Sequence, residues 1–290
     1  MFDMKRVLLF GGTGHLGKKI AAELKKRNYE TTAIVRSQAK AAELENTVDR
    51  CVVADVTQRA QLENICENFQ VVVSSLGKSV SPNDKSKATF FDVDFTANSN
   101  ILREALKGKV KKFVYVSALD AEKYPHLEYF KTHHDFSEQL KNSGLDYSII
   151  KPPAIFSAFL DLMLMAKKGQ LINIGAGDKL TNPIYEGDLA NITVDSIDRA
   201  NAVIEAGGVE ILSRRQINEI IQNTIRPQKK VRTVPLGLFK FALPLIKIFD
   251  KNSFDKFAFF VEVTQHDTVA TQIGEMRLEE YVRRAASTVN

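Results

Sequence analysis

The chain has 290 residues, of which 44% are hydrophobic and 26% are charged, and its formal net charge is +5 at pH 7. These values are ordinary for a globular protein with ample core, in one large or two modest domains. The start of the chain leads directly into a predicted strand, so we expect no secretory signal, and no run approaches the roughly 20 apolar residues that span a bilayer. The two cysteines, Cys51 and Cys66, lack metal-ligand spacing and fit a reducing compartment, so we expect a cytoplasmic protein.

The excess positive charge lies in one segment. Residues 226–256 hold eight lysines and arginines against Asp250 and Asp255, a net charge of +6, so the rest of the chain sums to −1. One basic face is typical of nucleic-acid-binding proteins, but these charges are interleaved with apolar residues. They are accompanied by no helix-turn-helix, RNA-binding or zinc motif, and we therefore expect no nucleic-acid partner.

The first predicted strand, residues 7–10, runs directly into three evenly spaced glycines, Gly11, Gly14 and Gly17. Glycine permits a tight turn and a close approach of a pyrophosphate to the backbone, and free N–H groups at a helix start attract the anion. Gly17 lets the following helix lie close to the strand. Because the loop lies between a strand and a helix, it predicts a site for the phosphates of a dinucleotide.

Strands and helices alternate through the first half of the chain. Further strands are expected at residues 32–35, 51–54, 71–73, 112–116 and 147–150, and helices at 18–27, 96–106 and 136–142. Short apolar strands separated by helices indicate a parallel sheet that is covered on both faces. With the glycine-rich first turn, the pattern predicts an α/β fold of the Rossmann type, a doubly wound parallel sheet.

This alternation ends at Pro152 and Pro153. We expect a dinucleotide-binding domain over residues 1–151 and a smaller, mostly helical cap over 152–290 that is partly interleaved with the sheet. In the cap, Ser213 and Gln216 have the spacing of a capping box, which predicts a helix start.

Six segments in this order resemble the atypical and extended branch of the short-chain dehydrogenase/reductase superfamily, near its NmrA-like and sugar-nucleotide-epimerase-like members. The matching segments are residues 11–17, 54–57, 93–98, 114–118, 143–152 and 182–190. The resemblance implies binding of a nicotinamide dinucleotide, a small-molecule substrate between the nicotinamide and the cap, and dimers of the kind common among relatives. It also implies further cofactor contacts, at Thr13, His15, Leu16, Asp55, Val56, Ser75, Leu76, Gly77 and Pro152.

The residues directly after the second predicted strand indicate which cofactor is bound. A carboxylate at this place binds the ribose 2′-hydroxyl of NAD, whereas a cation accommodates the 2′-phosphate of NADP. Here Arg36 and Ser37 follow the strand, and the first acid is Glu43. A guanidinium can bind a phosphate bidentately and a serine can add a hydrogen bond. The alternative is that Arg36 is a solvated arginine in a loop without a ligand. The phosphate-binding interpretation is the favoured one, so we expect NADP(H) to be preferred over NAD(H).

Typical members of the family use a serine after the fifth strand and a Tyr-x-x-x-Lys pair on the next helix. The resemblance assigns the serine to Ser117 and the proton-transferring tyrosine to Tyr129, and it puts His133 where the lysine is usual. Histidine near pKa 6.5 is mostly neutral at pH 7, so tyrosine activation is expected to be weaker, or to rise as the pH falls and His133 gains charge. Lys131 can replace the lysine only if the helix is irregular, because two positions along a helix lead to another face.

Three histidines, His126, His133 and His134, lie close together in the sequence but form no zinc motif, so we expect no metal site.

The cap contains a strongly apolar segment, residues 236–249, in which Lys240 and Lys247 are seven residues apart and share one helical face. Pro244 is expected to kink or split this helix. Several phenylalanines follow up to residue 260. Three interpretations of residues 236–260 stay open: a helix pair that packs the cap, an apolar lid over a hydrophobic substrate, or a surface that docks on a membrane or a protein.

Two functions follow from these residues. One is an NADP(H)-dependent oxidoreductase or a related isomerase, in which Ser117 and Tyr129 polarise a carbonyl or alcohol oxygen of a small, apolar substrate. The other is a non-catalytic regulator, similar to NmrA-like proteins, in which NADP(H) occupancy changes binding to a protein partner. The presence of both Ser117 and Tyr129 favours the enzyme. A histidine at position 133 in place of the usual lysine, beside an intact glycine loop, is typical of the regulator.

Overall fold

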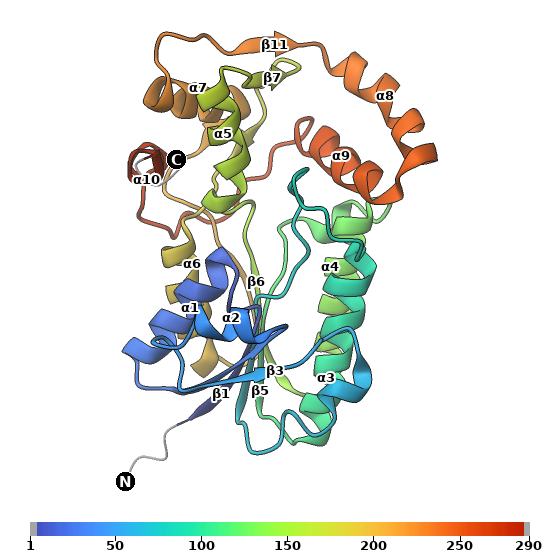
Figure 1. The fold of residues 1–290 in the computed structure, drawn as a ribbon, viewed down its shortest axis with the longest axis vertical. Coiled ribbons are helices and arrows are strands. Elements are labelled where there is room, and N and C mark those ends of the chain that lie inside the picture. The colour runs from blue at the N-terminus through green and yellow to red at the C-terminus, as the bar shows by residue number, and fades with distance from the viewer. Residues whose placement is uncertain (1–4, 287–290) are drawn as a thin grey trace. The chain divides into compact units, whose positions relative to one another are not determined.

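A computed structural model describes residues 5–286, and the chain divides into two compact units (Figure 1). The first unit consists of Met1–Lys78, Ala88–Lys151 and Leu189–Ile204, and the second of Ser79–Lys87, Pro152–Asp188 and Glu205–Asn290. Each unit therefore takes segments from both halves of the sequence.

The first unit is built on a seven-stranded sheet in the order β3-β2-β1-β4-β5-β6-β9. Its strands are β1 (Arg6–Phe10), β2 (Glu30–Val35), β3 (Arg50–Val53), β4 (Val71–Ser74), β5 (Lys112–Val116), β6 (Asp146–Lys151) and β9 (Ala202–Glu205). Neighbouring strands from β3 to β6 pair in parallel. Each of the six strands expected from the sequence overlaps one of these, and the predicted Rossmann-type fold is confirmed.

Helices cover both faces of this sheet (Figure 1). They are α1 (His15–Lys26), α2 (Gln38–Ala42), α3 (Asn98–Lys107), α4 (Glu128–Lys141) and α6 (Glu186–Asp195). In Figure 1, α1 lies on one face, and α3 and α4 lie on the other. The end of α6 lies on the α1 side, where Asp195 pairs with Arg27 just after α1. The sheet is thus doubly wound, and its direction of winding changes between β1 and β4.

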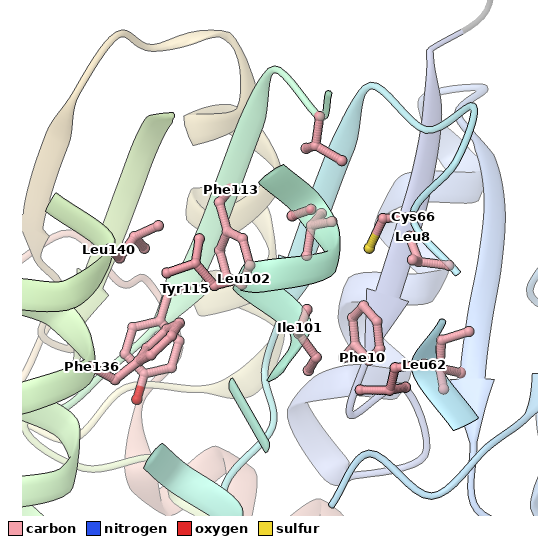
Figure 2. Close-up of a cluster of buried hydrophobic side chains, with 14 of the residues drawn as sticks. Leu8, Phe10, Leu62, Cys66, Ile101, Leu102, Phe113, Tyr115, Phe136 and Leu140 are labelled. Carbon is pink, nitrogen blue, oxygen red and sulfur yellow. The ribbon is translucent and has the colours of Figure 1, made fainter. Parts of the chain in front are cut away.

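Apolar side chains of the sheet pack beneath α3 and α4, as Figure 2 shows. Fully buried members of this cluster are Leu8, Phe10, Phe113, Tyr115 and Phe136. The rings of Tyr115 and Phe136 meet edge to face with centroids 4.6 Å apart, which holds α4 against β5. Burial of each large apolar side chain contributes about 1.5–3 kcal/mol to folding.

All three helices expected in the first half of the sequence begin earlier in the structure; the first, expected from residue 18, begins at His15. A π-helix, Phe91–Ala97, precedes α3, whereas the expected helix began at residue 96. It follows a turn in which the Asp92 carboxylate accepts hydrogen bonds from the Thr89 N–H and hydroxyl, both at 2.8 Å. The helix expected over residues 136–142 begins at Glu128. Its N-cap residue is Leu127, which is not a polar capping residue, so the sequence does not mark this start.

The second unit is mostly helical. It contains α5 (Leu160–Lys168), α7 (Arg214–Ile225), α8 (Leu236–Phe249), α9 (Lys251–Val263) and α10 (Leu278–Ala286). Two short strand pairs accompany them: β7 (Ile172–Ile174) with β11 (Arg232–Val234), and β8 (Leu180–Thr181) with β10 (Leu212–Ser213). The capping box of Ser213 and Gln216 is confirmed at the start of α7.

A buried lysine holds the segment 79–87 to α9. The Lys256 ammonium donates to the carbonyl oxygens of Ser81 at 3.0 Å and Asp84 at 2.8 Å. Pro244 lies inside a single helix, α8, so of the two expected effects the split is wrong, and the kink stays a prediction. Within residues 5–286, none of the helices combines the length and the apolarity that crossing a bilayer demands.

Candidate functional site

The three evenly spaced glycines form a tight loop between β1 and α1. The Gly14 N–H donates to the Gly11 carbonyl oxygen at 3.1 Å, and α1 begins at the next residue. A Cβ at Gly17 would lie 2.0 Å from that carbonyl oxygen, so only glycine lets α1 come this close. Gly11 has φ +79° and a Cβ there would lie 2.7 Å from the carbonyl carbon of Ser75.

This loop fits the phosphates of a dinucleotide. The first turn of α1 carries no acidic residue, and Gly14 at its N-cap offers no side chain that would occupy the free N–H groups of the described helix. The backbone N–H groups and the helix dipole therefore favour an anion at this place.

The ends of β2 and β3 carry the residues expected at the adenosine end of a cofactor. Arg36 is exposed directly after β2, and the Ser37 hydroxyl caps α2 by accepting from the Lys40 N–H at 3.3 Å. After β3, Asp55 accepts from the Thr57 N–H at 2.9 Å and from the Thr57 hydroxyl at 2.7 Å. These bonds form a compact turn, and the neighbouring Val56 packs against the core.

Glu43, the first acid after β2, is neutralised by two lysines. Its carboxylate pairs with Lys18 of α1 at 2.7 Å and with Lys40 of α2 at 2.5 Å. Hydrogen bonds from Lys18 and Lys40 lower the pKa of Glu43 to about 2. The carboxylate is therefore already engaged, and Arg36 is the charged group that directly follows β2.

Residues 75–77 connect the glycine loop to a second cluster of polar groups. The Ser75 N–H and hydroxyl both donate to the Phe10 carbonyl oxygen, at 3.1 and 3.2 Å. The Leu76 N–H donates to the Ser74 hydroxyl at 3.4 Å. A Cβ at Gly77 would lie 3.1 Å from Asp94 Oδ1. The carboxyl end of β4 thus adjoins the glycine loop and a buried carboxyl group.

The second cluster joins β5, α4 and the π-helix. His133 of α4 is buried, and its Nδ1 lies 2.7 Å from the Tyr115 hydroxyl. Its Nε2 lies 3.5 Å from Oδ1 of Asp94, which is also buried. This arrangement suits the tautomer with hydrogen on Nε2, in which Nδ1 accepts from Tyr115.

Ser117 and Tyr129 border this cluster. Ser117 directly follows β5, and its hydroxyl lies 3.1 Å from the Ser137 hydroxyl, which donates to the His133 carbonyl oxygen at 2.7 Å. The Tyr129 ring meets the His133 ring at 4.7 Å between centroids. The structure therefore brings together the three residues that the sequence assigns to catalysis, Ser117, Tyr129 and His133, although the role of each stays a prediction.

Burial sets the protonation of these groups. It lowers the pKa of His133 from 6.5 to about 4, so the imidazole is neutral at neutral pH. Burial, and then the charge of Asp94, raise the pKa of Tyr129 well above its ordinary value of 10. Burial also raises the pKa of Asp94. Tyr129 is thus a protonated phenol, and the expected gain of charge on His133 is moved to much lower pH than the sequence indicates.

Replacing His133 is expected to change how stability depends on pH. The folded state holds His133 neutral, so the free energy of unfolding falls as the pH drops from about 6.5 to about 4, in total by about 3 kcal/mol. In His133→Gln this fall should be absent, because glutamine binds no proton. Urea unfolding of both proteins at a series of pH values measures the difference. The exposed His126, replaced by glutamine, is the control, and equal pH dependence of all three proteins would contradict the burial argument.

Other predicted site residues lie outside these two clusters. Lys131 is exposed on α4 and pairs with Asp135, so the regular helix turns it away from His133. Pro152 is a buried residue of the second unit, and its contact with a cofactor stays a prediction. In the loop, Thr13 is half-buried, His15 exposed and Leu16 buried. Among residues 5–286, no group of three or more His, Cys, Asp or Glu is placed to hold a metal ion.

Asp94, Tyr115 and Ser137 contribute to the candidate site, although no sequence pattern assigned them to it. Asp94 and Tyr115 lie inside two segments that match the family, residues 93–98 and 114–118. That position was the usable signal for these two residues. Ser137 gave none, because a serine in a helix is ordinarily exposed.

Comparisons with known proteins agree with the geometry. A family model described as NAD(P)H-binding matches residues 11–200. The divinyl chlorophyllide a 8-vinyl-reductase of Arabidopsis thaliana is 26% identical over 260 residues, which are 83% of this chain and 62% of the reductase. The photosystem II assembly factor Ycf39 of Synechocystis is 23% identical over 264 residues, 88% of this chain and 78% of that protein.

A solved structure shares the fold. The NADPH-dependent quinone oxidoreductase of Escherichia coli, complexed with NADPH, superposes with a TM-score of 0.69 at 21% identity, covering 96% of this chain and 99% of that one. The match of the family model extends from the glycine loop through all of the strands β2 to β6. The chain therefore belongs to the NAD(P)H-binding family, in agreement with its resemblance to atypical short-chain dehydrogenase/reductases.

Proposed function

We propose that this protein is an NADP(H)-dependent reductase of a small, apolar carbonyl compound. The observation that carries the proposal is the continuity of the two clusters. Residues 75–77 adjoin both the glycine loop and Asp94, and Asp94 adjoins His133, which meets Tyr129. Cofactor phosphates and a proton donor would thus lie at the carboxyl ends of the neighbouring strands β1, β4 and β5, the usual place for ligands in such sheets.

The protonation of Tyr129 favours reduction over oxidation. Oxidation of an alcohol needs a base to remove the hydroxyl proton, whereas reduction of a carbonyl needs an acid to supply one. Burial raises the pKa of Tyr129, and the neutral His133 brings no positive charge that would lower it. Tyr129 is therefore suited to donate a proton to a carbonyl oxygen, and Ser117 to hydrogen-bond that oxygen.

A bound NADPH would supply the hydride. One hydride and one proton then convert the carbonyl compound to an alcohol, or a quinone to a hydroquinone. Quinones are apolar carbonyl compounds, and the quinone oxidoreductase of Escherichia coli shares this fold. We therefore test a quinone first: consumption of NADPH, followed by its absorbance, should depend on both the protein and the quinone. Absence of turnover with quinones and other apolar carbonyl compounds would overturn the proposal.

Arg36→Asp is expected to reverse the preference for NADPH over NADH. The guanidinium would bind the 2′-phosphate, and a charged hydrogen bond contributes about 1.5–3 kcal/mol, so NADPH binding should weaken at least about tenfold. The introduced carboxylate can bind the ribose hydroxyls of NADH instead. Titration calorimetry measures both. Arg50→Asp, at the amino end of β3, is the control, and an unchanged preference in Arg36→Asp would show that Arg36 is a solvated loop residue.

A second function, an NADP(H)-sensing regulator, is favoured by one observation. His133 is neutral where typical relatives carry a charged lysine, so the tyrosine is less activated. The similarity to a photosystem II assembly factor also supports a role through a protein partner. In that case NADPH would change the capture of a partner, and Tyr129→Phe would leave this capture unchanged.

A further inference from the structure

The helix α8 presents an apolar face to solvent. None of its 14 residues, all of which the structure describes, is buried. The side chains of Phe241 and Ile248 are each 77% exposed and that of Phe249 is 87% exposed. Leu238 and Leu245 are also more than half exposed. Such large apolar side chains on one helix are unusual at a free surface.

The exposed residues share one side of the helix. Leu238, Phe241, Leu245 and Ile248 follow one another at intervals of three and four residues, which places them in one row. The half-buried positions of α8 lie on another side, at Leu236, Phe239, Ala242, Leu243 and Ile246, and the helix packs against α9. The packing of the helix pair, one of the interpretations open from the sequence, therefore uses one side of α8 and leaves the apolar row uncovered.

The segment that carries this row is also rich in positive charge. Residues 226–249 contain six lysines and arginines and no acid. All six are exposed: Arg226, Lys229, Lys230, Arg232, Lys240 and Lys247. On the helix, Lys240 and Lys247 stand seven residues apart, so they share one side and border the apolar row along one edge. The Lys247 ammonium lies 5.2 Å from the centroid of the Phe254 ring of α9. The rest of the chain has a net charge of −1, so the charge is specific to this segment.

We propose that α8 docks on the surface of an anionic phospholipid bilayer and lies in its interface. An apolar row with lysines along its edge is the pattern by which a helix inserts side chains between lipids while cations meet the headgroups. A helix of 14 residues is about 21 Å long, which is short of the roughly 30 Å hydrocarbon core, so α8 lies on the membrane rather than across it. Pairing with a second copy through this face would bring like charges together.

Binding of the full chain to vesicles tests the proposal. Sedimentation with vesicles of phosphatidylcholine and phosphatidylglycerol in equal parts is compared with sedimentation on phosphatidylcholine alone. We expect binding to the anionic vesicles, at least about tenfold weaker binding to the neutral ones, and a loss at high salt. Equal binding to both kinds of vesicle, or none to the anionic kind, would overturn the proposal.

Two double variants separate the apolar row from its charges. Phe241→Asp with Ile248→Asp should lose at least about tenfold in binding, because both side chains would enter the lipid. Lys240→Glu with Lys247→Glu should lose about fivefold or more for each lysine. Lys111→Glu is the control. Lys111 is exposed in the first unit, and its replacement changes the net charge as much as the aspartate double variant does, so this variant should bind vesicles as the wild type does.

Circular dichroism and thermal unfolding show whether each variant is folded. We expect both double variants to fold, because the four replaced side chains are exposed. Unchanged vesicle binding in both double variants would show that another surface carries it. Light scattering adds a further outcome: a wild-type dimer that the aspartate variant converts to a monomer, without vesicle binding, would identify a second copy as the occupant and overturn the proposal.

Discussion

Gly14→Ala is expected to weaken NADPH binding at least about tenfold while leaving thermal unfolding unchanged. A Cβ at Gly14 would lie 3.4 Å from the Gly11 carbonyl oxygen, an ordinary contact, and the backbone of Gly14 (φ −71°, ψ 167°) suits alanine. The protein itself therefore accepts the methyl group. The proposed phosphates would not, because the methyl group stands at the N-cap of α1, where they approach the backbone.

Gly17→Ala is the matched variant, because its methyl group would disturb the packing of α1 against the loop after β1 rather than face the phosphates directly. Its Cβ would lie 2.0 Å from the Gly11 carbonyl oxygen, so α1 must move away from β1, at a cost of about 1–3 kcal/mol. Thermal unfolding and calorimetric titration of both variants measure the contrast. If Gly14→Ala bound NADPH as tightly as the wild type, the loop would not be the phosphate site, whatever Gly17→Ala does to stability.

Tyr129→Phe is expected to lower the turnover of the carbonyl substrate by about a hundredfold to ten-thousandfold, the usual contribution of a positioned proton donor. NADPH affinity should not change, since the ring and its contacts with Phe90 and His133 remain. A loss in kcat without a loss of NADPH binding would separate catalysis from folding. Tyr147→Phe, on β6, is the control.

The two proposed functions diverge in this variant. Turnover that survives in Tyr129→Phe would exclude Tyr129 as the acid and leave Ser117 or water to supply the proton. An NADPH-dependent capture of a protein partner that is the same in wild type and variant, with no turnover in either, would favour the regulator.

The sheet and the glycine loop could be predicted because both depend on local patterns. Runs such as residues 71–73 and 112–116 are continuous and apolar, as buried parallel strands are, and they recur with helices between them. Gly11 and Gly17 are required by close backbone contacts, and their spacing is visible in the sequence. The capping box at Ser213 is likewise a local signal.

The buried cluster was harder to predict because it depends on packing. An aspartate in a helical segment is ordinarily exposed, and nothing in the spacing around Asp94 reveals the π-helix that holds it in the interior. Tyr115 belongs to the cluster through its hydroxyl, which contacts His133, a residue 18 positions further along the chain. The early start of α4 has no polar cap residue. In contrast, Thr89 just before the π-helix and Asp92 in its first turn have the spacing of a capping box, which is visible in the sequence.

Calorimetric titration of the wild-type protein with NADPH, NADP⁺, NADH and NAD⁺ shows whether the glycine loop and Arg36 together bind a phosphorylated dinucleotide. We expect saturable, one-site binding of NADPH and NADP⁺ that is at least about tenfold tighter than binding of NADH and NAD⁺. Equal affinity for all four would contradict the role of Arg36, and binding of none of them would contradict the proposed cofactor site itself.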